Sequence, residues 1–167
     1  MKGYPAHAAA SRAIDSPVGP LVLLASRAGL AGLFFGRRKG EVTSPEDDPD
    51  NRHLNEAEAQ LREYFAGDRT AFELVFDVRG TPFQQSVWTE LGRIPFGATR
   101  SYGEIAERIG KPNSSRAVGA ASGSNPISII LPCHRVIGAN GSLTGFGGGL
   151  ELKRQLLVME GALLDVG

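Results

Sequence analysis

The hydrophobic pattern of the chain changes at Arg79-Gly80, and this change limits the possible folds more than any other feature. Before it, short apolar runs at 11–14, 21–26 and 30–35 are separated by turns containing Pro and Gly, which predicts an antiparallel meander. After it, apolar residues recur at helical spacing. We therefore expect a flexible lead-in at 1–10, an α/β domain at 11–80 and a mainly α-helical domain at 81–167.

Two further elements are predicted in the first half. Apolar residues at three- and four-residue spacing predict a helix over 52–66, with Gly67 as its stop. Alternating apolar residues over 71–78 predict another strand. The polar segment 36–51 is expected to be a surface loop. No catalytic group of residues is evident in this half, so we expect it to be a scaffold.

The second half contains two strong helix-start signals. Thr81 with Gln84, and Ser101 with Glu104, have the spacing of a capping box. Helices are predicted over 82–94, 102–109 and 114–122. The short turn between the last two is typical of a helix-turn-helix, and equally of a plain αα-hairpin.

The helix predicted from Ser114 consists almost entirely of small residues between Ala117 and Gly123, with Arg116 as its one long charged side chain. Glycine destabilises a helix by about 1 kcal/mol relative to alanine. Such a helix is favoured where its backbone must approach another surface closely, such as a second helix or a DNA groove. Residues 99–136 carry five basic and two acidic side chains, a pattern that fits either a polyanion partner or solvated helix faces.

The last predicted helix, at 150–160, is expected to bury four apolar side chains and ends in an acidic one. The apolar residues are Leu152, Leu156, Leu157 and Met159. Glu160 lies at the end of the helix, where the helix dipole disfavours a carboxylate. A specific partner such as a histidine would explain its position, and simple solvation is the alternative.

The run 131–137 holds the single cysteine of the chain, Cys133, next to His134. Apolar residues precede the run and a Gly- and Asn-containing segment follows, which is the setting of a desolvated but reachable thiol. A lone cysteine is more often a small buried hydrophobe. Adjacent side chains of a strand point to opposite faces, so direct contact between the two needs a turn, which Pro132 permits.

Composition excludes several classes. One cysteine excludes an internal disulfide and a multi-cysteine zinc site, and the three histidines lack metal-ligand spacing, so neither metal nor cofactor is expected. No apolar run has transmembrane length and the N-terminus lacks a signal-peptide pattern. The formal net charge of zero favours no partner class. We expect a monomer in the cytoplasm, a reducing compartment, with no membrane partner.

The segment 82–161 resembles the O6-alkylguanine-DNA alkyltransferase family of its bacterial and archaeal type. The residues that carry the resemblance are Phe83-Gln84, Val87-Trp88, Ile94-Pro95, Gly97, Ser101-Tyr102-Gly103, Arg116-Ala117-Val118-Gly119, Asn125-Pro126, Pro132-Cys133-His134-Arg135-Val136 and Glu160-Gly161. They cover about half of the chain in the family's order. The segment 14–20 also looks like the bacterial branch.

The resemblance implies a ribonuclease-H-like α/β domain followed by a winged-helix-like domain that contains a helix-turn-helix. It further implies a direct-reversal DNA repair protein, associated with the nucleoid in a prokaryote. Such a protein flips O6-alkylguanine out of duplex DNA and transfers the alkyl group to Cys133 irreversibly and stoichiometrically. This is a methylated-DNA–protein-cysteine S-methyltransferase that acts once. Activity on O4-alkylthymine stays open.

The resemblance also implies the catalytic roles. Cys133 is the acceptor, and His134 with Glu160 removes its proton through a bridging water, so that the His need not touch the sulfur. Tyr102 donates a proton to the departing guanine. Asn125 braces the link between the small-residue helix and the cysteine run.

For DNA, the resemblance implies that the small-residue helix enters the minor groove and that Arg116 fills the place of the flipped base. The implied DNA contacts are Arg116, Ala117, Gly119, Ser122 and Arg135. The implied substrate contacts are Tyr102, Val136, Phe146 and Gly147. Phe146 stands where the family usually has tyrosine, which leaves any role of that hydroxyl unfilled. With one cysteine, the zinc site of some animal members cannot be built.

Three other functions are compatible with parts of this pattern. A non-catalytic lesion binder of related fold usually has tryptophan in place of Cys133. A helix-turn-helix regulator with a redox-sensing thiol needs base-reading side chains, which the small-residue helix lacks. A cysteine hydrolase needs an oxyanion hole, for which no motif is evident.

Overall fold

The computed structural model describes residues 4–36 and 45–164, and the chain divides after Val78 into two compact units. The expected boundary lay two residues further on. The segment 37–44 of the predicted loop, the first three residues of the lead-in and residues 165–167 lie outside the described residues. No helix among the described residues is long and apolar enough to cross a lipid bilayer.

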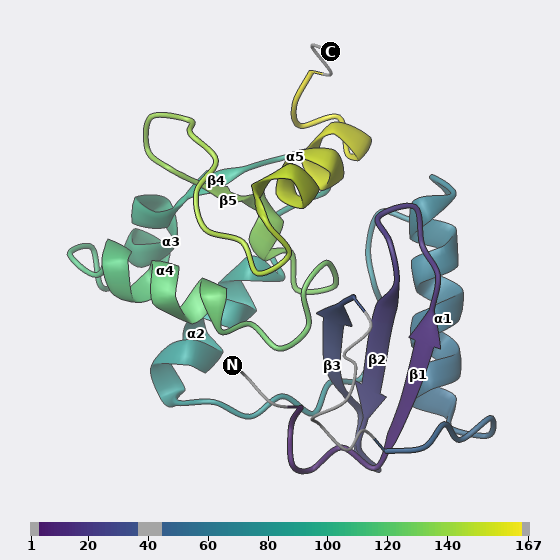
Figure 1. Cartoon of the computed structure of the whole chain (residues 1–167). Coiled ribbons are helices and arrows are strands. Elements are labelled where there is room, and N and C mark those ends of the chain that lie inside the picture. The colour runs from purple at the N-terminus through teal and green to yellow at the C-terminus, as the bar shows by residue number, and fades with distance from the viewer. Residues whose placement is uncertain (1–3, 37–44, 165–167) are drawn as a thin grey trace. The chain divides into compact units, whose positions relative to one another are not determined.

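The first unit is an antiparallel sheet covered by one helix (Figure 1). Its strands β1 (Ala10–Ile14), β2 (Leu21–Ala25) and β3 (Leu30–Phe35) pair in chain order, as the meander pattern predicts. Helix α1 (Arg52–Phe65) lies along the sheet. All five residues of β2 are buried because the strand is central and covered.

The apolar stripe of α1 is the one the sequence pattern predicts. It buries Leu54, Ala57, Leu61 and Tyr64. The helix begins where the side chain of Asn51 accepts a hydrogen bond from the Leu54 amide at 2.9 Å, which satisfies one of the free amides of the first turn. This packed layer gives the unit its core.

The prediction of a strand over 71–78 is wrong, apart from one bridged residue. The segment makes a single parallel bridge, between Phe76 and Leu30, and Val75 is exposed. The bridge depends on Gly29, where a Cβ atom would come within 2.8 Å of the Val75 carbonyl oxygen. The alternating pattern of 71–78 therefore arises because one side of the segment packs against the protein, and not because the segment pairs along its length with another strand.

The flexible lead-in predicted for 1–10 is also wrong for its later residues. The Ala9 amide donates to the Ala25 carbonyl at 2.8 Å, and Ala10 is buried as the first residue of β1. The ring of His7 bonds the Asp77 carbonyl through Nε2 at 2.8 Å. Backbone pairing therefore fixes residues that composition alone leaves unassigned.

The second unit is mainly helical. Its helices are α2 (Pro82–Leu91), α3 (Tyr102–Arg108), α4 (Ser115–Gly123) and α5 (Leu150–Met159). Both predicted capping boxes are formed, at Thr81 and at Ser101. Helix α2 ends three residues before the predicted end. The predicted burial of Met159 is wrong, because that side chain faces solvent.

A small parallel pair of strands closes this unit: β4 (Arg100–Ser101) pairs with β5 (Val136–Ile137). The pairing brings the start of α3 to the segment that follows Cys133. In the helical layer, the indole Nε1 of Trp88 on α2 donates to the Ala121 carbonyl of α4 at 2.8 Å. The strand pairing therefore holds the cysteine run against the start of α3, and the Trp88 hydrogen bond holds the small-residue helix against α2.

Candidate active site

Cys133 begins a tight turn. Pro132 has φ −81° and ψ 68°, the inverse γ-turn conformation, and the Cys133 amide donates to the Leu131 carbonyl at 2.8 Å. A single 3-10 turn, Cys133–Arg135, follows. The chain is therefore not extended here. The described residues contain no direct hydrogen bond between the Cys133 sulfur and His134, which is 0% exposed.

The loop before this turn is braced by Asn125. Its side-chain Nδ2 donates to the Leu131 carbonyl at 2.7 Å, and its Oδ1 accepts from the Ile127 amide at 2.9 Å. Within the loop, Ile129 has φ +73°, a left-handed conformation that is unfavourable for a β-branched residue. Asn125 thus holds both ends of a strained loop that leads into the cysteine turn.

His134, Arg135 and Glu160 form a buried cluster. The His134 Nε2 lies 2.8 Å from Glu160 Oε2, and Arg135 donates to the same carboxylate from Nε at 2.7 Å and from Nη2 at 2.9 Å. A third donor of Arg135, Nη1, bonds the Ile94 carbonyl at 2.7 Å. The specific partner that the position of Glu160 suggested is therefore present, with a second one beside it.

The protonation of His134 follows from this cluster. Burial lowers the pKa of His134, although the hydrogen bond to Glu160 opposes the shift. A neutral ring that donates from Nε2–H to Glu160 keeps Nδ1 as an acceptor. Nδ1 is buried and has no hydrogen-bond partner among the described residues. It is a basic nitrogen available to take a proton.

The Cys133 thiol lies in an environment with opposing effects. Burial raises the pKa of the thiol, whereas hydrogen bonds with Asn125 and Ser128 and the charge of Lys153 lower it. The sulfur lies 3.9 Å from the Ser128 hydroxyl oxygen. Because burial is the largest of these effects, the resting thiol stays protonated at neutral pH and needs a base to become a nucleophile.

Lys153 is the functional candidate that sequence reasoning missed. It is 0% exposed on α5, and its Nζ donates to the Val136 carbonyl at 2.6 Å and to the Thr144 carbonyl at 2.7 Å. Lys153, Leu156 and Leu157 have the spacing of one helix face, so a lysine within an apolar stripe was the available signal.

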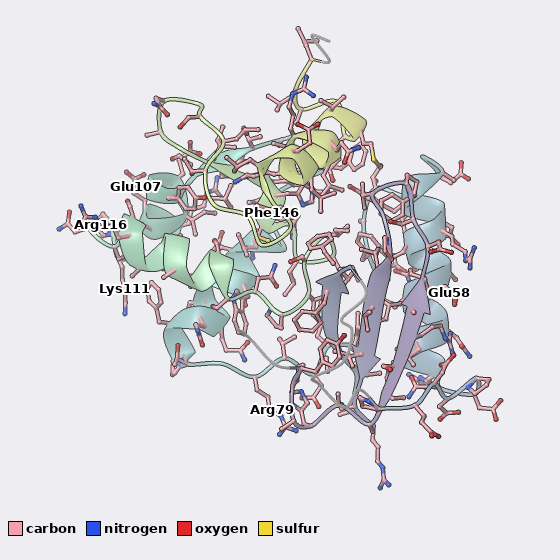
Figure 2. The ribbon with its side chains drawn as sticks, viewed as in Figure 1. Glu58, Arg79, Glu107, Lys111, Arg116 and Phe146 are labelled. Carbon is pink, nitrogen blue, oxygen red and sulfur yellow. The ribbon has the colours of Figure 1, made fainter. Side chains whose placement is uncertain are left out.

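The remaining predicted substrate contacts lie around this lysine. The Tyr102 hydroxyl donates to the Thr144 carbonyl at 3.0 Å. Phe146 and Gly147 follow in the glycine-containing loop before α5, where Phe146 is half-buried and Gly147 exposed (Figure 2). Both backbone groups of Val136 are engaged: its amide donates to the Cys133 carbonyl, and its carbonyl accepts from Lys153.

Helix α4 presents part of the predicted DNA contacts to solvent. Arg116 and Ala117 are exposed, and Arg116, in the first turn of the helix, points outward (Figure 2). Gly119 is half-buried beside Tyr102, where an added Cβ would lie 3.8 Å from the ring. These three positions remain candidates for contact with a partner.

Two residues predicted to contact DNA are buried in this structure, Ser122 and Arg135. Ser122 is buried on the inner side of α4, so its hydroxyl is not on the helix surface. Arg135 is buried because its guanidinium is taken up by Glu160 and the Ile94 carbonyl. The position of Arg135 next to the catalytic candidates in sequence suggested a surface cation, but its role here is to bind the carboxylate.

Family models match both units. Residues 82–162 match the DNA-binding domain of 6-O-methylguanine DNA methyltransferase, and residues 11–78 match the ribonuclease-like domain of the same protein. A methylated-DNA–protein-cysteine methyltransferase of Mycobacterium bovis is 52% identical over 149 residues, which are 89% of this chain and 90% of that protein. The chain belongs to this family.

Further relatives extend the match. The Methanosarcina acetivorans methyltransferase is 48% identical over 89% of this chain and 96% of its own length. The crystal structure of Mycobacterium tuberculosis OGT in complex with DNA has a TM-score of 0.83 at 50% identity and covers 91% of this chain and 92% of that one. A Methanococcus jannaschii O6-methylguanine DNA methyltransferase has a TM-score of 0.65 at 29% identity, covering 93% and 96%.

Membership in the methyltransferase family confirms the predicted fold class and activity. The chain is an O6-methylguanine DNA methyltransferase, a repair protein that binds DNA and transfers a methyl group to cysteine. Its first unit is the ribonuclease-like α/β domain and its second is the helical DNA-binding domain. This activity differs from that of a redox-sensing regulator and from that of a cysteine hydrolase.

Proposed function

We propose that Cys133 is the methyl acceptor and that each molecule repairs one O6-alkylguanine in duplex DNA, irreversibly. One observation carries the proposal: the only cysteine of the chain lies in a tight turn beside a buried histidine whose Nδ1 has no hydrogen-bond partner among the described residues. A transfer to cysteine can therefore end only at this sulfur.

The proposed step begins with removal of the thiol proton. The proton passes through a water to Nδ1 of His134, while Glu160 accepts from Nε2–H and stabilises the charge that the ring acquires. The thiolate sulfur attacks the alkyl carbon, the bond between that carbon and O6 breaks, and a thioether forms. The departing guanine takes a proton delivered by Tyr102. The step leaves an imidazolium at His134 and a phenolate at Tyr102, whose charges cancel until solvent exchanges the proton between them, so no cofactor is needed.

The pocket and DNA contacts are proposed on exposure and position. A base inside the duplex is out of reach of a buried thiol, so the base must be flipped out. Phe146, the backbone of Gly147 and the second lone pair of the Val136 carbonyl, which already accepts from Lys153, would then bind it. Asn125 would hold the loop behind the sulfur. Minor-groove contact requires a slim helix, which suits the exposed Ala117 and the neighbouring Gly119. Arg116 would fill the vacated stack.

The two glycines of α4, Gly119 and Gly123, support this role because packing within the protein does not require them. At Gly119 an added Cβ would make only ordinary contacts, and at Gly123 it would meet nothing within 4 Å. Gly119, inside the helix, nevertheless lowers helix stability by about 1 kcal/mol relative to alanine. The glycines are therefore better explained by a surface outside the chain.

Mass spectrometry of the protein after incubation with a duplex containing O6-methylguanine tests the proposal. We expect a gain of one methyl group in place of a hydrogen, located on the peptide that contains Cys133, and no reaction beyond one equivalent. Cys133→Ser serves as the matched control and should bind the duplex without gaining mass. Continued turnover, or a methyl group on another residue, would overturn the assignment.

A further inference from the structure

Lys153 combines complete burial with the absence of a carboxylate partner. Its side chain is 0% exposed, and no ion pair joins it to an acidic residue among the described residues. Its two acceptors are backbone carbonyls, of Val136 at 2.6 Å and Thr144 at 2.7 Å. Burying an ammonium group against neutral acceptors is costly, so such a group is expected to have a role beyond packing.

Both carbonyls belong to the segments that follow the cysteine turn. Val136 follows the 3-10 turn that begins at Cys133, and Thr144 belongs to the loop that carries Phe146. The Thr144 carbonyl also accepts from the Tyr102 hydroxyl at 3.0 Å, and the ammonium lies 6.0 Å from the centre of the Tyr102 ring. One cation on α5 therefore joins β5, the loop and the start of α3.

The charge of Lys153 also acts on the sulfur. It lowers the pKa of Cys133, and the Cys133 thiolate in turn raises the pKa of Lys153, which burial lowers to about 8. The other cation near the turn is Arg135, whose charge is offset by Glu160 through two hydrogen bonds. Lys153 is thus the cation whose charge is free to favour the thiolate.

We infer that Lys153 is a positioning residue for methyl transfer: its ammonium fastens the Phe146 loop to β5 and holds a positive charge toward the Cys133 sulfur. The inference rests on the proposed transfer to Cys133 and deepens it. Lys153 keeps its proton throughout, because the thiol proton goes to His134. Once the sulfur is a thioether, the attraction between the two groups is gone.

The shared acceptor gives Lys153 a second task in the same step. In this structure the Tyr102 hydroxyl is bound to the Thr144 carbonyl. To donate to the departing guanine, the hydroxyl must release that carbonyl. Lys153 is then the donor that remains on the Thr144 carbonyl, so the loop stays in place while Tyr102 acts.

Replacing the lysine tests both parts of the inference. Lys153→Met keeps the length and removes the charge and the donors, Lys153→Arg keeps the charge, and Lys111→Met removes an exposed lysine of the same unit as a control. The thiol pKa is measured from the pH dependence of Cys133 labelling by iodoacetamide. Transfer is measured with O6-methylguanine in a duplex and circular dichroism checks folding.

We expect Lys153→Met to raise the thiol pKa by about one unit or more, which lowers labelling at neutral pH roughly ten-fold. Transfer should fall further than labelling, because the loop is released as well. Lys153→Arg should restore most of the thiol pKa, and Lys111→Met should leave it unchanged. A wild-type thiol pKa in folded Lys153→Met would overturn the inference.

A reciprocal measurement covers the case in which the methionine variant does not fold. The pKa of the Lys153 ammonium is followed by NMR of its ε-carbon in the wild type and in Cys133→Ala. Because the two groups titrate as a pair, linkage requires the wild-type curve, followed to a pH at which the thiol ionises, to differ from the single-step curve of Cys133→Ala. Superimposable curves in the two proteins would show that the groups are uncoupled. If wild-type Cys133 gains no methyl group, it is the proposed function that fails.

Discussion

Glu160 accepts hydrogen bonds from two residues that are adjacent in the chain, His134 and Arg135. The planar guanidinium binds the carboxylate through two of its nitrogens and so fixes its orientation. Charge balance between Arg135 and Glu160 lets the buried histidine stay neutral. The same contact stabilises a carboxylate at a helix end, where the helix dipole opposes it.

The two arginines assigned to DNA by resemblance should therefore behave differently. Arg135→Met leaves Glu160 buried without its cation, and we expect it to lower the free energy of unfolding by about 3–5 kcal/mol. Arg116→Ala removes an exposed side chain and should change stability by less than about 0.5 kcal/mol. Urea denaturation measures both. Similar stability losses in the two variants would contradict the reassignment of Arg135.

Repair assays complete this comparison. If Arg116 fills the vacated stack, Arg116→Ala should slow repair of duplex O6-methylguanine more than reaction with the free alkylated base. The free base needs no flipping, so it serves as the internal control. Equal losses on the two substrates would remove the stacking role from Arg116.

The buried histidine predicts how stability depends on pH. Burial lowers the pKa of His134 in the folded protein, so below about 6.5 the unfolded chain binds a proton that the folded protein does not. Stability from this group is therefore complete above pH 6.5 and is lost as the pH falls below that value. We expect His134→Gln to reduce the loss between pH 7.5 and 5.5, measured by denaturant unfolding. An unchanged slope would show that His134 titrates alike in both states.

At the scale of the element, α4 contains a glycine, Gly119, that lowers helix stability although packing inside the chain does not require it. Its buried face is Val118, Ala121 and Ser122, and its exposed face is made of small residues after Arg116. Helix α3 before it ends normally, with Gly110 at φ +75° in the position that a left-handed terminus requires. The two glycines, Gly110 and Gly119, therefore serve different purposes.

Alanine substitution separates these purposes. Gly119→Ala should stabilise the protein by about 0.5–1 kcal/mol and weaken duplex repair, because the new methyl group widens the helix. Gly110→Ala should destabilise by about 1–2 kcal/mol, because alanine is strained at positive φ. Thermal unfolding and single-turnover repair measure the pair. A stabilised Gly119→Ala with full duplex repair would contradict groove contact by this face.

At the scale of the whole molecule, local signals in the sequence predicted most elements. Each of the two capping boxes joins polar groups only three residues apart, so the starts of α2 and α3 could be predicted from the local sequence. The segment 71–78 could not, because alternation does not say whether a partner strand exists; here the partner is one residue, Leu30.

Part of the site was equally beyond reach from the sequence. Cys133, His134 and Glu160 follow from a family pattern, but the burial of Arg135 depends on the Ile94 carbonyl and Glu160, which are distant in sequence. The burial of Lys153 was unpredictable for the same reason, because its two acceptors come from other segments of the chain. Long-range contacts decide whether a cation faces solvent or the interior.

Methylation of Cys133 should also change the stability of the whole protein. Cys133 is 8% exposed, so a methyl group on its sulfur adds volume to a packed site and removes the contact with the Ser128 hydroxyl. We expect the methylated protein to be less stable by about 1–3 kcal/mol. Denaturant unfolding of the two forms, prepared from one batch with and without substrate duplex, measures the difference. Coincident curves would show that the site accommodates the methyl group freely.

The single sulfur has a consequence outside the chemistry of one encounter. A thioether no longer ionises, and the chain has no second cysteine to pass the group to. If the transfer is irreversible, as we propose, each polypeptide that has reacted keeps its methyl group. The mass of the peptide that contains Cys133 then shows whether that molecule has reacted. In a population of molecules, the modified fraction then measures how much alkylation the DNA has received. The protein would serve as a dosimeter whose range is set by its copy number.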